Sequence, residues 1–236
     1  YDARKAVRQR YKETSDLIKI TATGGVMSVA TSGQNPQFTE DELEAIITTA
    51  REYGLPVAAH AHGIEGMKRA IRAGVNSIEH GTFLDNEAVE LMKQKGTVLV
   101  PTLTVAEWAT EKAKEEGYFP EVVRKKAAEV GPVTKKALER AYKGGVKIVF
   151  GTDFSGDNNL GEFALMVKAG MKPMDTIIAA TLNAAQLQRV DDKLGSIKAG
   201  KLADIVAVKG NPMEDIRTME NMMFVMKNGK IYKNEK

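Results

Sequence analysis

The sequence lacks cysteine and contains only three histidines among its 236 residues. Without cysteine, disulfides and cysteine-ligated metal sites are excluded, and nothing indicates an oxidising compartment. No apolar run approaches the roughly 18 residues that a membrane-spanning helix needs. We therefore expect a protein of the cytoplasm that does not act at a membrane.

The chain also lacks an excess of either charge. It has 34 lysines and arginines against 31 acidic residues, for a net charge of +3, and no basic stripe. This balance argues against nucleic acid as a partner. Hydrophobic residues make up 43% of the chain, which is enough for a sizeable core. The length suits one large domain or a barrel with a small appendage.

Short apolar segments alternate with helical segments through most of the chain. A capping box at Thr39–Glu42 opens one helix, and Gly74 and Gly96 follow two others. This alternation predicts βαβ units and a parallel sheet with both faces covered. The expected strands are 16–22, 56–61, 75–79, 97–100 and 146–150, and one helix is expected over 173–188.

The unusual residues gather at the carboxyl ends of the expected strands. A doubly wound sheet would satisfy the strand count, but this placement favours an α/β fold of the (β/α)₈ barrel type, about five of whose eight strands are present. After residue 189 the expected strands, near 202–208 and 222–232, have no helices between them, and Asn228-Gly229 predicts a hairpin. We expect a partial barrel over 1–189 and part of a small β-sandwich over 190–236.

Four residues at these strand ends form one candidate metal site: Lys19, His60, His80 and Asp153. In a barrel these ends surround one mouth, so the side chains converge there. Neutral imidazole and carboxylate suit zinc or a similar divalent ion. Each residue alone has an ordinary alternative, namely a hydrogen-bonded histidine, a turn aspartate or a lysine on a solvated face.

Lys19 and His62 need separate treatment. Lys19 lies within an apolar strand, and a sheet covered on both faces gives it no solvated face, so we expect it in the mouth or reaching past it to solvent. A neutral amine there could react with carbon dioxide to give a bridging carbamate. His62 shares a strand face with His60, and it contacts either the substrate or a neighbouring polar group.

The motifs that hold these residues, taken in order, resemble the amidohydrolase superfamily. The similarity is greatest to its imidazolonepropionase-related, metal-dependent dipeptidases and carboxypeptidases, including Xaa-Pro dipeptidases. The end of the chain agrees, since 181–185 and 194–206 resemble the last barrel helix and the entry into the β-sandwich. The site motifs are Leu17-Ile-Lys-Ile-Thr-Ala-Thr-Gly-Gly25, His60-Ala-His-Gly63, Ile78-Glu-His-Gly81 and Gly151-Thr-Asp153.

The resemblance implies a role for each residue. Lys19 would be the carboxylated lysine that bridges two divalent ions, such as zinc. His60 and His80 would hold the second ion, and Asp153 would bind the first and shuttle the proton. A metal-bridging hydroxide would then hydrolyse the amide bond of a dipeptide or an N-acyl amino acid. Two alternatives remain: a mononuclear deaminase or imidazolone-type C–N hydrolase, and a non-catalytic fragment.

One family feature is missing from the chain. The family carries a His-x-His pair on its first strand, and no such pair precedes Lys19. The charged N-terminus also lacks an initiator methionine and a signal peptide. We therefore expect the first strands to belong to a preceding part of the same fold and the isolated chain to have little activity. Homo-oligomer formation stays open.

The loops around the mouth are expected to set specificity. They are 23–38, 101–120 and 154–161, and none of them identifies a substrate side chain. The Lys/Glu-rich segment 107–142 predicts either a solvated helical pair or a lid over the mouth.

Overall fold

A computed structural model describes residues 1–157 and 159–235. Asn158, in the loop 154–161 expected to contribute to specificity, and Lys236, at the end of the expected β-sandwich segment, lie outside the described residues. Within the described residues, no helix is both long and apolar enough to cross a membrane.

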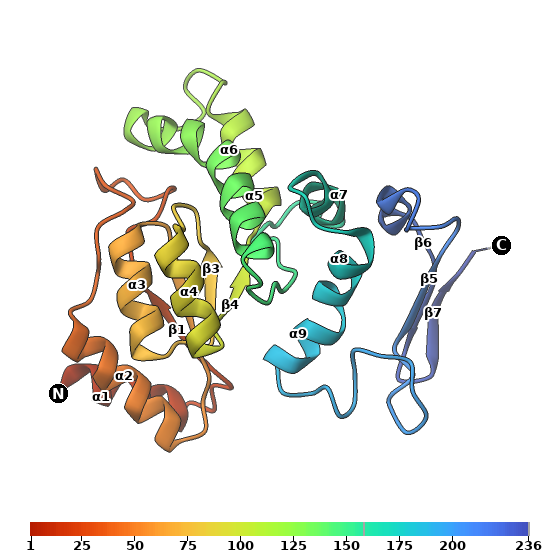
Figure 1. The fold of residues 1–236 in the computed structure, drawn as a ribbon, viewed down its shortest axis with the longest axis horizontal. Helices are drawn as coiled ribbons and strands as arrows, with labels where there is room; N and C mark the ends of the chain where they lie inside the picture. The colour runs from red at the N-terminus through yellow and green to blue at the C-terminus, as the bar shows by residue number, and fades with distance from the viewer. Residues whose placement is uncertain (158, 236) are drawn as a thin grey trace.

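A parallel sheet and four helices form the N-terminal half (Figure 1). The strands lie in the order β1-β2-β3-β4, and buried residues such as Ile20, Ala59, Ile78 and Leu99 join them to the helices in one core. The elements are α1 (Asp2–Lys12), β1 (Ile18–Thr21), α2 (Glu40–Glu52), β2 (Val57–Ala61), α3 (Ile64–Ala73), β3 (Ser77–His80), α4 (Asn86–Lys95) and β4 (Val98–Val100).

The residues that the sequence predicts to begin and end helices do so in the structure. The backbone N–H of Thr39 donates to Glu42 at 2.9 Å at the start of α2. Gly74 (φ 103°) and Gly96 (φ 72°) end α3 and α4 in the left-handed conformation, which glycine adopts without steric cost. These ends fix where each chain segment turns back into the next strand.

The fifth expected strand, 146–150, does not form a ladder. It makes a single parallel bridge between Leu99 and Ile148, supported by a bond from the Val149 N–H to the Leu99 carbonyl at 2.9 Å. Pairing stops there because the next donor from β4 would be the backbone nitrogen of residue 101, which is proline and has no N–H. The Phe150 N–H, on the other side of the segment, donates to Ala179 O at 3.2 Å. The segment has the expected place in the sheet but not the expected regular strand.

The expectation that the sheet is covered on both faces is wrong at β1. Lys19 and Thr21 are exposed, whereas Ile18 and Ile20 between them are buried. The same face is buried at Ser77 of β3 and at β4, where Val98 and Val100 pack with Leu187. Lys19 therefore lies on a solvated face because nothing in the described part of the chain packs over that edge.

Two long helices follow β4, α5 (Leu103–Lys112) and α6 (Glu121–Lys143), and pack as a hairpin that projects from the sheet (Figure 1). They are followed by α7 (Gly161–Lys168), α8 (Pro173–Ala180) and α9 (Leu182–Leu187). The prediction of a single helix over 173–188 is wrong in one respect. The helix is interrupted at Thr181, whose φ of −118° and ψ of −86° are not helical.

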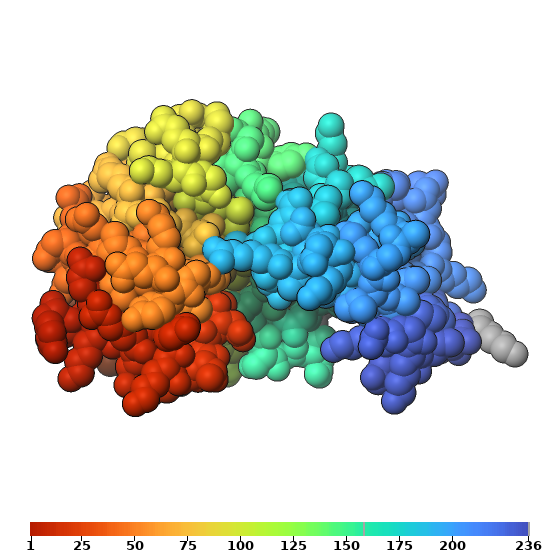
Figure 2. All heavy atoms as spheres, turned by 90° about the horizontal axis from the view of Figure 1, so that it is seen from below, coloured from red at the N-terminus to blue at the C-terminus, as the bar shows by residue number. Residues whose placement is uncertain are grey.

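The C-terminal segment forms a separate antiparallel sheet of β5 (Ile205–Val208), β6 (Met222–Lys227) and β7 (Lys230–Asn234). The expected hairpin joins β6 to β7, with Asn228 and Gly229 at positive φ. A 3₁₀ turn, η1 (Ile216–Glu220), packs against α7 through Phe163. Figure 2 shows this segment at the opposite end of the molecule from the N-terminal helix.

Candidate metal centre

The three histidines of the chain lie together at the carboxyl ends of β2 and β3. Ala61 pairs with His80 across these strands, which brings His60 and His62 beside it. The ring centroids are 4.6 Å apart for His60 and His62, 4.6 Å for His60 and His80, and 4.8 Å for His62 and His80. One ring nitrogen from each lies within 4.8 Å of the others, so the three could hold one metal ion.

Two threonines orient these rings. The Nδ1 atom of His62 lies 2.7 Å from the Thr82 hydroxyl, and that of His80 lies 2.7 Å from the Thr102 hydroxyl. When Nδ1–H donates to such an oxygen, the lone pair of Nε2 is left for a metal. The third ring, His60, lies with Nε2 at 3.4 Å from the Gly24 carbonyl.

Burial keeps the imidazoles neutral. It lowers the pKa of His62 from 6.5 to about 3, with a further contribution from the neighbouring His60. It likewise holds the pKa of His80 well below its ordinary value, and it lowers that of His60. Neutral imidazole is the form that binds metals, so the rings need not release a proton first at neutral pH.

A cavity of about 220 Å³ opens onto the histidines and includes Asp153 in its wall. An Asp153 carboxylate oxygen lies 3.9 Å from His80 Nε2, and its side chain is 66% exposed. Apolar side chains from loop 23–38 and the α5–α6 hairpin form the other walls. They include Val26, Met27, Val105, Ala106, Ala109 and Val130.

Lys126 of α6 fixes this loop over the cavity. Its ammonium donates to the carbonyls of Gly25, Ser28 and Ala30 at 3.1, 2.6 and 2.8 Å. Loop and hairpin are therefore joined on the side of the cavity opposite the strands.

Lys19 does not line the cavity. It lies on the same face of β1 as Thr21, whose backbone pairs with His60, but one row nearer the amino ends of the strands. Its charge adds to burial in lowering the pKa of His60, so it acts on the cluster from nearby. The structure thus gathers His60, His62, His80 and Asp153 around one cavity and leaves Lys19 beside it.

Three residues at the cavity have positive φ although none is glycine: His80 (72°), Thr102 (50°) and Asp153 (48°). Residues other than glycine adopt this backbone conformation at a cost of about 1–3 kcal/mol, and such residues concentrate at functional sites. The surrounding structure must hold them in place.

Sequence reasoning missed four polar residues of this region: Glu79, Thr82, Thr102 and Glu162. Burial raises the pKa of Glu79, which accepts a bond from the Ser77 hydroxyl at 2.5 Å. The two threonines lie just after the expected strands, and that position could have identified them. Glu162 gives no local signal, because its partners are 58 and 59 residues away.

The donor set fits a divalent metal. Three neutral imidazoles converge, two have their second nitrogen held by a hydroxyl, and a carboxylate stands at the cavity mouth. Nitrogen and oxygen donors of this kind suit zinc.

A model of the amidohydrolase family matches residues 1–233. The chain belongs to the amidohydrolase family. It is 36% identical to an ochratoxinase of Aspergillus niger over 98% of this chain and 49% of that protein. It is 26% identical to an imidazolonepropionase of Shewanella sp., over 96% of this chain and 56% of that protein.

Among solved structures, a Xaa-Pro dipeptidase with bound methionine in the active site is 55% identical, with a TM-score of 0.96 over 99% of this chain and 58% of that one. The likeness confirms the expected family branch and the barrel-type α/β fold, and it places the chain in a family of hydrolases. The chain spans about half the length of the curated relatives it matches.

Proposed function

We propose that this amidohydrolase cleaves the amide bond of a dipeptide or an N-acyl amino acid. The observation that carries the proposal is the cluster of three neutral histidines beside Asp153 in one cavity. We assign His60, His80 and Asp153 as ligands of zinc, with Lys19 as a carbamate that bridges two ions. The 55% identity to a structure described as a Xaa-Pro dipeptidase supports this substrate class.

The residues around the cavity have different roles in the proposed hydrolysis. Zinc, when bound, supplies a Lewis acid for the amide oxygen and lowers the pKa of water. Asp153, exposed at the mouth, accepts the proton of the attacking water and delivers it to the leaving nitrogen. His62, held by Thr82, contacts the substrate. The apolar walls of loop 23–38 and α5 exclude water from the reacting bond.

The proposal includes a preceding part of the same fold. We propose that residues 1–189 complete a barrel with that part and that residues 190–236 complete a small β-sandwich. The position of β1 at the edge of the sheet supports this, since in a closed barrel another strand would pair along that edge. The cytoplasmic location, the absence of a nucleic-acid partner and the oligomeric state stay predictions.

The isolated chain is then expected to hydrolyse dipeptides poorly even with added zinc. Robust turnover by the isolated chain would contradict an incomplete site. If neither the isolated chain nor the complete protein binds a metal ion although it is folded, the non-catalytic alternative is favoured.

A mononuclear C–N hydrolase is the second candidate, because Lys19 lies outside the cavity wall and the imidazolonepropionase of Shewanella sp. is a relative. Metal analysis of the complete protein separates the two, with about two zinc ions expected for the first and one for the second. Under the first proposal Lys19→Ala lowers the count to about one and abolishes hydrolysis. Lys12→Ala, at an exposed lysine of α1, is the matched control and leaves both unchanged.

A further inference from the structure

Glu162 is a fully buried carboxylate in the first turn of α7. One of its oxygens accepts the N–H of Leu103 at 2.8 Å, and the other accepts the N–H of Thr104 at 2.7 Å and its hydroxyl at 2.6 Å. These two amides are the first of α5, which have no acceptor within the helix. A residue of one helix thus caps another helix 58 residues earlier in the chain.

This distant cap replaces a local one. The residue at the N-cap of α5 is Thr102, a type that normally bonds these amides with its own hydroxyl. Here Thr102 makes no such bond. Its hydroxyl lies 2.7 Å from His80 Nδ1 instead. The helix start and the histidine compete for one hydroxyl, and Glu162 removes the competition by satisfying the helix.

Thr102 also needs support in its backbone. Its φ of 50° and ψ of 49° are left-handed, which is disfavoured for a β-branched residue. A Thr102 that relaxed to the usual N-cap conformation would turn its hydroxyl toward the amides of α5. The two amides bonded to Glu162 directly follow Thr102, so they fix the peptide that this relaxation would move.

We propose that Glu162 is a positioning residue that acts through Thr102 to hold the ring of His80 with Nε2 toward the cavity. Part of this inference, the benefit to metal binding, rests on the proposed function. The contact between Thr102 and His80 does not, so the two can be tested apart.

The first test uses the metal-free complete protein with ¹⁵N-labelled histidine. The imidazole signals of His80 are assigned by their loss in His80→Asn. Thr102→Val removes the hydroxyl, and Glu162→Gln is expected to shift the His80 signals in the same direction, toward mixed tautomers. Thr102→Ser restores the wild-type signals. Unchanged His80 signals in Glu162→Gln overturn the proposal, whether or not the protein binds metal.

Met166→Ala controls for general loosening of α7, since Met166 is buried in the same helix, whereas the α5 amides are bonded to Glu162. It is expected to lower the melting temperature and leave the His80 signals in place. If it shifts them as Glu162→Gln does, the effect is loss of packing and the proposal fails.

The second test measures zinc affinity by competition with a chelator. Loss of a group that orients a metal-bound histidine lowers affinity about 10-fold or more. Glu162→Gln and Thr102→Val are each expected to show this, and the double variant to match either single variant because the two act in series. Multiplied effects in the double variant would contradict action through Thr102. A wild-type protein that binds no zinc would refute the proposed function while the tautomer test still decides this inference.

Discussion

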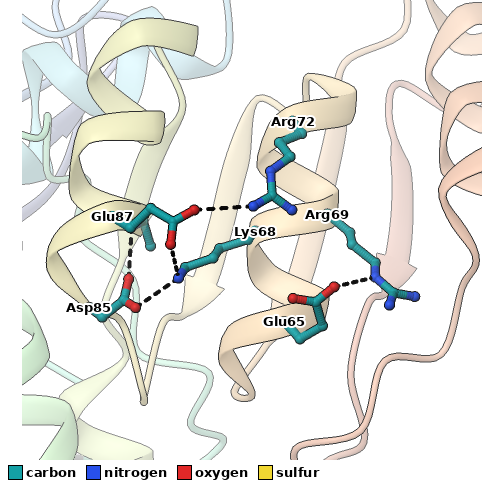
Figure 3. A network of polar contacts seen from close by, with 7 residues as sticks. Glu65, Lys68, Arg69, Arg72, Asp85 and Glu87 are labelled. Carbon is teal, nitrogen blue, oxygen red and sulfur yellow. Dashed lines mark hydrogen bonds and ion pairs between the residues drawn. The ribbon is translucent and has the colours of Figure 1, made fainter.

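The histidine cavity lies at the carboxyl ends of β2 and β3, and charged contacts join α3 and α4, the helices that follow these two strands. The two regions use polar groups in opposite ways. In the contacts between the helices, Lys68 meets Asp85 at 2.8 Å and Glu87 at 2.5 Å, and Arg72 meets Glu87 at 3.2 Å (Figure 3). Each charge there faces an opposite charge, and the carboxylates are 41% and 58% exposed.

At the cavity each imidazole has one neutral polar partner, namely the hydroxyl of Thr82 or Thr102 or the carbonyl of Gly24. Three imidazoles stand in contact, with their pKa values lowered mainly by burial, and the nearest carboxylate is 3.9 Å from His80. The backbone at His80, Thr102 and Asp153 is strained as well. Buried imidazoles that line a cavity beside strained backbone indicate a site prepared for a ligand, whereas the paired charges serve only to join two helices.

We expect Asp153→Asn, at the cavity, to have a much larger effect than any change to the charged contacts between α3 and α4. The amide cannot accept the proton that the reaction releases, so we expect the rate of dipeptide hydrolysis by the complete protein to fall by about 10²- to 10⁴-fold. The fold should persist because the side chain is exposed and makes no core contact. Turnover measured beside the circular dichroism spectrum checks both statements.

Asp157→Asn is the matched control, since Asp157 lies exposed in the same loop and does not line the cavity. It should keep near wild-type turnover. Equal losses in the two variants would mean that the loop, and not the carboxylate of Asp153, is what the reaction needs.

Sequence reasoning located the helices and the histidine cluster because these depend on local signals. Short segments of the sequence indicate the helix cap at Thr39, the helix ends at Gly74 and Gly96, and the strand ends at His60 and His80. The four-stranded sheet and the C-terminal hairpin followed in the same way.

The errors concern contacts between distant segments. The exposed face at Lys19 depends on what packs over β1, and the weak fifth strand depends on its pairing with β4, which is limited to one bridge. The role of Glu162 could not be predicted either, because an acidic residue early in a helix is ordinary by itself. Only the folded arrangement brings it to α5.

The pH dependence of stability offers an intermediate test. In the folded protein the pKa of His62 falls from 6.5 to about 3, so below pH 6.5 the unfolded chain binds a proton that the folded state does not. Acid therefore favours unfolding through the window from 6.5 down to 3. His62 alone should lower the free energy of unfolding of the metal-free protein by about 2 kcal/mol between pH 7 and pH 5.

His62→Gln should reduce that loss by about the same amount, as measured by urea denaturation at the two pH values. Lys68→Met serves as the contrast, because the hydrogen bonds that Lys68 donates to Asp85 and Glu87 raise its pKa further above this range. Its pH dependence should match that of the wild type. A wild-type slope in His62→Gln would show that His62 is not neutral in the folded state.

The smallest effect is expected when the charged contacts between α3 and α4 are broken. Lys68→Met removes both of its ion pairs, but pairs whose carboxylates are 41% and 58% exposed contribute little, and the melting temperature should fall by about 2 °C or less. Added salt should shrink even that difference, since it screens the wild-type pairs. Zinc content and hydrolysis should stay unchanged. A drop of 10 °C, or a loss of bound zinc, would mean that these contacts support the cavity, and the contrast between the two regions would fail.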